Sequence, residues 1–403
     1  MIHSFYIVNV SLFLIIVLPH QKKVVSLHIE KATNTMDTLS KIALVFTTGL
    51  GNTSIRRLID IYPNEDIFAL PLSELKTAFG THRSVLENIR NKSAFVRAEE
   101  ELRFCEKNHI RPLFFTDPDY PTRLNTPETD DCPALLYCLG TVNLNPERSI
   151  AVVGTRRATP VGRDNTDMLV QGLASYGPHI ISGLAYGIDS AAHTSALDHG
   201  LPTVAVLGHG LDRIYPESNR PLAKRIIENG GALVTEYPSG TAINPRYFPA
   251  RNRIIAALSD ATVVIEASDK GGALITAAIA GSYQREVFAI PGRLGDTYSK
   301  GTNNLIATNR ALLVRNARDI AFQLGWPIVG EQLAMDNLDD AKKLSSEEQR
   351  IVDQLKDNDI LTLEEISTST GFSLAKTASL LFNLEMDNCI HTLPGHTYQL
   401  IRK

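Results

Sequence analysis

The stretch Ser149-Ile-Ala-Val-Val-Gly154, followed at once by Thr155-Arg156-Arg157, determines the fold that we expect for this chain. The apolar run is typical of a buried parallel strand, and helices begin just after such runs. Two further runs follow the same plan and end in Ser182-Gly183 and in Glu266, shortly before Lys270-Gly271-Gly272. Because the carboxyl ends of parallel strands meet at one edge of a sheet, these turns predict a shared crevice that could hold phosphate.

Strand and helix patterns alternate from residue 111 to 325, after an irregular, proline-rich bridge over 111–131. This alternation predicts an α/β domain with an open, doubly wound, Rossmann-like sheet. The expected strand centres, with the last strand beginning at Leu312, are Val153, Ile181, Val206, Val234, Val264, Phe288 and Leu312.

Smaller domains are expected on both sides of residues 111–325. Residues 37–110 predict a small helical domain, in which Gly49-Leu50-Gly51 is typical of a helix-hairpin-helix (SAM-like) fold or of a plain helix-turn-helix. Residues 326–344 predict a linker, and residues 345–403 predict a winged-helix domain.

The predicted winged helix has an unusual charge balance. Two capping boxes open its first helices, and the third helix is expected to bury Leu374, Thr377, Leu381 and Leu384. Residues 346–403 carry nine acidic and five basic side chains, and Lys376 is the only cation on the third helix. This balance favours a protein contact or a passive cap over duplex binding.

The first 36 residues contain an apolar run, Phe5 to Leu18, which is shorter than the roughly 18–20 residues that span a bilayer. Basic residues follow this run instead of preceding it, unlike a secretory signal. We expect residues 1–36 to be a non-native extension ahead of a start at Met36. The alternative is a membrane-associated segment.

Composition excludes several classes of function. The 403 residues carry a net charge of −4, so any basic surface for nucleic acid must be local. The four cysteines lack paired zinc spacing, which predicts thiols in a reducing, cytoplasmic compartment and no metal. The chain has neither a dinucleotide fingerprint at Gly154 nor a P-loop, so no cofactor is expected.

Side chains suited to nucleic acid occur at the turns and in one further phrase. Arg156 places a bidentate cation beside the first glycine turn. Phe248, followed by Arg251-Asn252-Arg253, joins an aromatic face to cations, a combination that holds single strands without much sequence preference. The alternative is that both arginines pair with acids such as Glu236 while Phe248 fills the core.

Two other groups are open to a structural explanation. Asn303 and Asn304 could reach a ligand at a helix start or merely cap that helix. Asp189 and His193 lie one helical turn apart, but no nucleophile, base and orienting group accompany them. A charged first turn with a packed histidine is favoured over catalysis.

Taken together, these phrases resemble the DNA processing protein A (DprA, or Smf) family. The phrases are Val153 to Arg156, Ser182 to His193, Phe248 to Ile255, Glu266 to Ala277, Val287 to Gly292 and Gly301 to Ile306. The resemblance implies a non-enzymatic, cytoplasmic homodimer with no membrane partner. Such a protein binds and protects incoming single-stranded DNA and helps load RecA recombinase in natural transformation and recombination.

Carried over by position, the resemblance implies a set of DNA-binding residues, with backbone amides offered by the first glycine turn. The set is Gly154, Thr155, Arg156, Ser182, Gly183, Phe248, Arg251, Asn252, Arg253, Lys270, Gly271, Gly272, Asn303 and Asn304. Glu217 departs from the family, which often has a cation there. The alternative function is a phosphoribohydrolase-like, nucleotide-processing enzyme, but Pro291-Gly292 is followed by Arg293 instead of that family's glycine-rich phrase.

Overall fold

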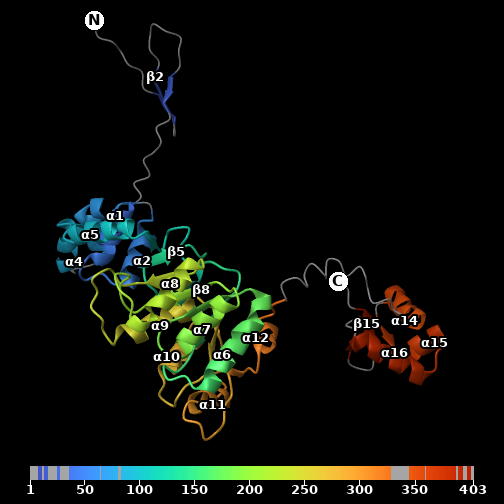
Figure 1. The fold of residues 1–403 in the computed structure, drawn as a ribbon. Coiled ribbons are helices and arrows are strands. Elements are labelled where there is room, and N and C mark those ends of the chain that lie inside the picture. Colours follow the sequence, from blue (N-terminus) through green and yellow to red (C-terminus); the bar gives the residue numbers. More distant parts are fainter. Residues whose placement is uncertain are drawn as a thin grey trace. The chain divides into compact units, whose positions relative to one another are not determined.

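The computed structural model describes three N-terminal strands by their backbone, residues 36–327 apart from 64 and 80–82, and residues 345–400 apart from 359, 387–388 and 394–396. The chain divides into two compact units, Met1–Trp326 and Pro327–Lys403 (Figure 1). Among the helices that are described, none is long and apolar enough to span a bilayer.

Two predicted segments fall largely outside the described residues. The linker expected over 326–344 does so from residue 328 onward. Of the segment expected over 1–36, the structure describes Met36 and a three-stranded antiparallel sheet formed by β1 (Val8–Val10), β2 (Phe13–Ile16) and β3 (Val25–Leu27).

A nine-stranded sheet forms the centre of the larger unit, in the order β12-β11-β10-β6-β7-β8-β9-β5-β4. The strands from β6 to β12 pair in parallel, which confirms the predicted α/β class, and each expected strand centre lies in one of them. Their bounds are β6 Ser149–Val153, β7 His179–Ser182, β8 Thr203–Val206, β9 Ala232–Thr235, β10 Ala261–Val264, β11 Glu286–Ala289 and β12 Leu312–Leu313.

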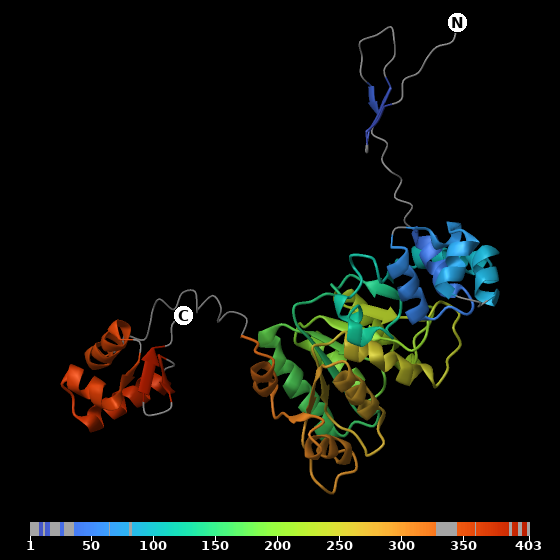
Figure 2. The same ribbon diagram turned by 180° about the vertical axis from the view of Figure 1, so that it is seen from behind.

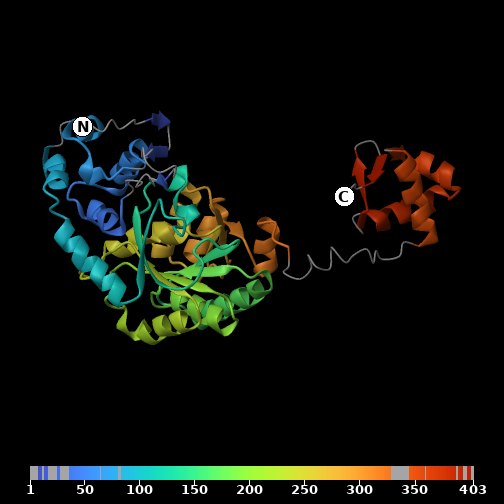
Figure 3. The same ribbon diagram turned by 90° about the horizontal axis from the view of Figure 1, so that it is seen from above.

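Helices cover both faces of this sheet (Figure 3). Strand order runs one way from β6 to β9 and the other way from β10 to β12, so right-handed crossovers place the two helix sets on opposite faces. The first set is α6 (Pro160–Leu173), α7 (Ile188–Asp198) and α8 (Arg220–Glu228), with α12 (Ala317–Gln323) against α6. The second set is α9 (Tyr247–Ala257), α10 (Gly272–Ser282) and α11 (Lys300–Ala307).

The bridge expected to be irregular over 111–131 is partly a strand. β4 (Ile110–Phe114) pairs antiparallel with β5 (Leu135–Gly140), which pairs in turn with β9. Pro112 tolerates this place because β4 is an edge strand, where one row of backbone N–H groups has no ladder partner. The rest of the bridge holds two short 3₁₀ turns, η2 (Thr122–Leu124) and η3 (Pro127–Thr129).

The N-terminal helices lie at the β4 end of the sheet (Figure 2). They are α1 (Thr38–Phe46), α2 (Asn52–Ile61), α3 (Leu72–Phe79), α4 (Arg83–Arg90) and α5 (Phe95–Lys107), with a 3₁₀ turn η1 (Ile67–Ala69). Gly49 turns the chain between α1 and α2 with a φ of +92°, a conformation that favours glycine. Ile42 and Leu44 share one continuous apolar core with Phe114 and Leu136 of the sheet.

The smaller unit has the predicted winged-helix fold. It comprises α14 (Ser346–Asp357), β13 (Leu361–Thr362), α15 (Leu363–Thr370), α16 (Leu374–Met386), β14 (Ile390–Leu393) and β15 (Thr397–Leu400). Both capping boxes are present, and Thr377, Leu381 and Leu384 are buried. The expectation for Leu374 was wrong, because its position at the start of α16 leaves it half exposed.

Candidate nucleic-acid interface

A hollow of about 220 Å³, here called the crevice, opens where β6 and β10 end. Its walls are the turn at 153–156, the start of α7, one side of α9 and the first turn of α10. The helices after β6 and β10 cross the sheet in opposite directions, so this is the point where strand order reverses. Ligands of open α/β sheets bind at such a point.

Two glycines bring the turn after β6 against the start of α7. A Cβ atom on Gly154 would overlap the side chain of Ile188, and one on Gly187 would overlap the carbonyl of Thr155. Gly187 also has a φ of +79°. Because the two segments pack backbone to backbone, Arg156 is held at the mouth of the crevice with its side chain exposed.

The prediction that Thr155 offers its amide to an anion was wrong. The Thr155 N–H donates to the Glu266 carbonyl at 2.8 Å, and the Thr155 carbonyl accepts from Ile188 N–H at 3.2 Å. This amide is therefore used to join the turn after β6 to β10. Thr155 and Gly154 still line the crevice.

At the start of the helix that follows the first turn, a carboxylate of the protein stands where a ligand anion could bind. The Glu266 carboxylate accepts from the backbone N–H of Thr159 at 3.0 Å and from its hydroxyl at 2.5 Å. Thr159 in turn caps α6 by accepting from Gly162 N–H at 3.0 Å. A buried anion of the protein thus already occupies the N-terminus of α6.

Of the three turns that were predicted to bind phosphate, two lead into helices whose starts already hold a carboxylate of the protein, and only the start of α10 is without one. The first turn of α7 holds the buried carboxylate of Asp189. Among the described residues at the start of α10, the Gly271 cap makes no side-chain bond and no acid stands in the first turn. Gly271, Gly272 and Ala273 line the crevice, so the positive end of this helix dipole faces it.

Arg251 lies inside the crevice wall and is 3% exposed. Its guanidinium donates to the Val206 carbonyl, and a Cβ atom on Gly183 would overlap it. Burial lowers the pKa of Arg251 to about 10, opposed by the charge of Asp189, so the side chain stays cationic at neutral pH. Burial raises the pKa of Asp189, and Arg251 opposes that shift.

Phe248 and Asn252 also line the crevice from α9. The guanidinium carbon of Arg156 lies 5.6 Å from the centre of the Phe248 ring. This ring also contacts Tyr215, with ring centres 5.5 Å apart. Neither Phe248 nor Asn252 is buried in the core, so both present a surface to a ligand.

The structure does not bring Ser182, Arg253, Asn303 or Asn304 to the crevice. Ser182 is fully buried, and its hydroxyl donates to the Val152 carbonyl at 2.7 Å. Arg253 forms an ion pair with Glu236 at 2.7 Å, which is the alternative considered above. Asn303 exchanges two hydrogen bonds with the backbone of Gly292, at 2.9 and 3.1 Å, and Asn304 is exposed on α11.

Lys270 lies beside the crevice instead of within it. Its exposed side chain and Arg310 line a shallow groove that shares Gly271 with the crevice. His193, near Asp189, is fully buried and bonds Thr203 at 2.7 Å, as expected for packing. Within the described part of the chain, no group of histidine, cysteine and acidic side chains could hold a metal ion.

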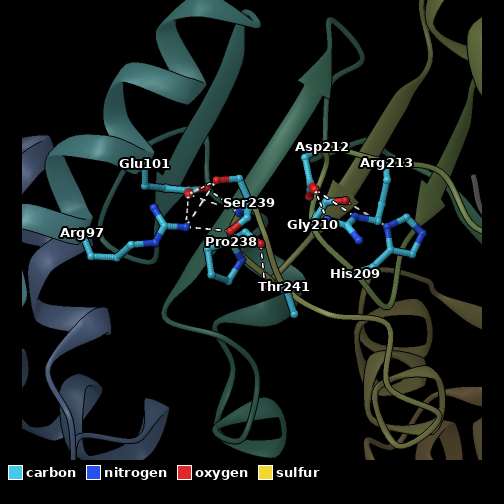
Figure 4. A network of polar contacts seen from close by, with 9 residues as sticks. All are labelled: Arg97, Glu101, His209, Gly210, Asp212, Arg213, Pro238, Ser239 and Thr241. Atoms are coloured by element: carbon cyan, nitrogen blue, oxygen red, sulfur yellow. Dashed lines mark hydrogen bonds and ion pairs between the residues drawn. The ribbon is translucent and has the colours of Figure 1, made fainter.

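Sequence reasoning missed two buried polar side chains, those of Glu101 and His209, that hold loops in place outside the lining of the crevice. Glu101 of α5 is buried, and its carboxylate accepts from Ser239 N–H at 2.9 Å and from Arg97 at 2.7 Å (Figure 4). This network ties α5 to the loop that leads into α9. On the facing loop, His209 accepts from Tyr215 N–H at 3.2 Å.

Comparison with known proteins confirms both the fold and the family that the sequence resembles. The model of the DNA recombination-mediator protein A family matches residues 111–325, and that of the DprA winged helix domain matches residues 338–396. Protein Smf of Escherichia coli (strain K12) is 34% identical over 290 residues, which cover 70% of this chain and 75% of that protein. The DNA processing protein DprA of Streptococcus pneumoniae is 41% identical over 204 residues, 51% of this chain and 71% of that protein.

The solved structure of DprA from S. pneumoniae covers 71% of this chain and 97% of its own, with 33% identity and a TM-score of 0.60. A solved structure of DNA processing protein A from Helicobacter pylori, a protein with a single-stranded DNA-binding mode, covers 53% of this chain with a TM-score of 0.47. The chain spans about half to three quarters of the length of the curated relatives it matches first, between 56% and 75%.

Proposed function

The chain belongs to the DNA recombination-mediator protein A family, and from this membership and the crevice we propose that it binds single-stranded DNA at the edge of its sheet. The observation that carries the proposal is the convergence of Arg156, the buried cation of Arg251 and the uncapped start of α10 on one hollow. Cationic donors and backbone amides are the groups that hold phosphate oxygens.

Phe248 supports a single strand over a double one. Its half-buried ring stands next to Arg156, and a base that is free of a duplex can stack on such a ring. Stacking and phosphate contacts do not distinguish among bases, so we propose binding with little sequence preference.

Wider roles follow from the family alone. We propose that the protein is a cytoplasmic homodimer that protects incoming DNA and helps to load RecA recombinase in natural transformation, without catalysing a reaction of its own. For the winged helix we propose a protein partner. The only cation of α16, Lys376, is paired with Glu347 at 2.5 Å, which supports this choice.

The test compares two neighbouring arginines. Affinity for a fluorescent oligothymidylate is measured by anisotropy, over a range of salt, for the parent, Arg156→Ala and Arg157→Ala. Both side chains are exposed, but Arg157 does not line the crevice. Loss of one charge-assisted contact should cost Arg156→Ala about 1.5–3 kcal/mol, whereas Arg157→Ala should lose much less. Equal affinities for parent and Arg156→Ala, or equal losses in both variants, would refute the assignment.

A further inference from the structure

A second hollow opens beside the crevice and is lined by two tyrosines that take no part in the proposed phosphate contacts. Tyr186 and Tyr215 are 50% and 47% exposed. They line this hollow with Arg156 and Phe248, which also line the crevice. We call Tyr186 and Tyr215 the tyrosine ledge.

The two tyrosines come from different loops that are joined to each other. Tyr186 belongs to the turn before α7, and its hydroxyl accepts from Ser218 at 3.2 Å. Tyr215 belongs to the loop after β8. The side-chain amide of Asn219 donates to the Leu184 carbonyl at 2.8 Å and to the Ser190 hydroxyl at 2.9 Å, which ties this loop to the turn.

The backbone around each tyrosine is also fixed by contacts of its own. The backbone N–H of Tyr215 donates to the buried side chain of His209, and its ring packs on Phe248. On the other side, Leu184 adopts a φ of +55° and is fully buried. A leucine with a left-handed backbone conformation costs free energy, and here the buried Leu184 side chain anchors the short turn that presents Tyr186 at the surface.

We propose that the tyrosine ledge is a stacking subsite for a nucleobase, next to the nucleotide whose phosphate enters the crevice. This inference rests on the proposed function. Because the two hollows share Arg156 and Phe248, a strand held at Arg156 continues directly onto the ledge. Rings that are preordered and half exposed bind the flat face of a base with little loss of side-chain entropy. Every base has such a face, so the subsite tolerates any sequence.

The experiment measures binding while the protein and the DNA are varied in turn, as in a double-mutant cycle, and it uses the full chain. One oligonucleotide is oligothymidylate, and the other has the same length and phosphates but abasic sites in place of the bases. The proteins are the parent, the double variant Tyr186→Leu/Tyr215→Leu, and Tyr62→Leu as a control tyrosine that lines neither hollow. A fourth variant, Tyr186→Phe/Tyr215→Phe, keeps the rings without the hydroxyl groups.

The parent should bind the abasic strand about tenfold more weakly than oligothymidylate. The double leucine variant should lose part of that difference by weakening on oligothymidylate alone, because Phe248 can still stack on a base, while the phenylalanine variant and Tyr62→Leu should match the parent. Equal binding of oligothymidylate by the leucine variant and the parent would overturn the ledge, and so would equal losses on both strands.

Failure of the ledge and failure of the proposed function give different results. Arg156→Ala should weaken binding to both strands, because it removes a phosphate contact that does not depend on a base. If Arg156→Ala does so while the leucine variant matches the parent, the crevice stands and the ledge is wrong. If the parent binds neither strand at low salt, the proposed function fails and the ledge fails with it.

Discussion

At the scale of single residues, glycines determine where Arg156 can stand. Gly187 has a positive φ, and any side chain there would overlap the carbonyl of Thr155. Gly281, on α10, has open space around it. Substitution by alanine should therefore destabilise the protein at Gly187 but not at Gly281.

Gly187→Ala should lower the free energy of unfolding by more than about 1–2 kcal/mol, since it adds an overlap to the cost of a left-handed alanine. Gly281→Ala should be neutral or stabilising by up to about 1 kcal/mol. Urea denaturation measures both changes. A fully stable Gly187→Ala would show that the turn does not need the close approach described here.

Burial of His193 gives the larger unit a defined dependence on pH. The hydroxyl of Thr203 donates to the Ile180 carbonyl at 2.8 Å, so it accepts from Nδ1–H of His193 at 2.7 Å. The ring is then neutral, and burial lowers the pKa of His193 from its usual 6.5 to about 3. Above pH 6.5 the ring is neutral in both folded and unfolded protein. Below that pH the unfolded protein takes up a proton, and stability is lost until about pH 3.

His193→Leu should flatten this dependence. Between pH 6 and 5, the parent should lose about 1 kcal/mol of unfolding free energy more than the variant does. Denaturation at a series of pH values measures the difference. Parallel curves for the two proteins would mean that His193 takes up a proton as readily in the folded state as in the unfolded state, which would contradict the lowered pKa.

Sequence reasoning identified Arg156, Phe248 and Asn252 because their chemistry can be read from local phrases. It left open whether Arg253 binds a ligand or pairs with Glu236, because both choices use the same side-chain chemistry. It missed the hydrogen bond from the Thr155 amide to the carbonyl of Glu266, a residue that is distant in sequence and lies beside Thr155 because β6 and β10 are neighbours. Whether such a group binds a ligand or a partner within the protein depends on the tertiary structure, which local sequence does not reveal.

At the scale of elements, the same glycine-rich pattern produced three different helix starts. Glu266 occupies the start of α6, Asp189 lies in the first turn of α7, and α10 is left open to the crevice. The sequence predicted the strands and helices well, because buried parallel strands are continuous apolar runs. It missed β4, because Pro112 is compatible only with an edge, and edge position is not visible locally.

Glu266→Gln tests the closed start of α6. The amide keeps one acceptor but loses the charge and places an NH₂ group near two donors, so about 1–3 kcal/mol of unfolding free energy should be lost. Thr159→Ser keeps the capping hydroxyl and should stay within about 0.5 kcal/mol of the parent. Chemical denaturation of both variants provides the measurement, and an unchanged Glu266→Gln would contradict the capping role.

At the scale of the whole molecule, the two compact units have separate cores. All the crevice-lining residues belong to the larger unit. The winged helix carries more acids than bases, and its ion pair between Lys376 and Glu347 leaves α16 poorly suited to phosphate.

A chain that ends at Pro327 should therefore bind oligothymidylate within about twofold of the full chain at the same salt concentration. Anisotropy titrations of the two proteins measure this ratio. A loss of tenfold or more in the shorter chain would assign a share of DNA binding to the winged helix.

Hydrogen exchange of the full chain, with and without oligothymidylate, tests most directly whether DNA binds in the crevice. We expect slower exchange at residues 271–274 and 156–157, where phosphate would meet the start of α10 and the turn after β6, with no change over 345–400. Protection confined to the winged helix, with 271–274 unaffected, would contradict DNA binding in the crevice.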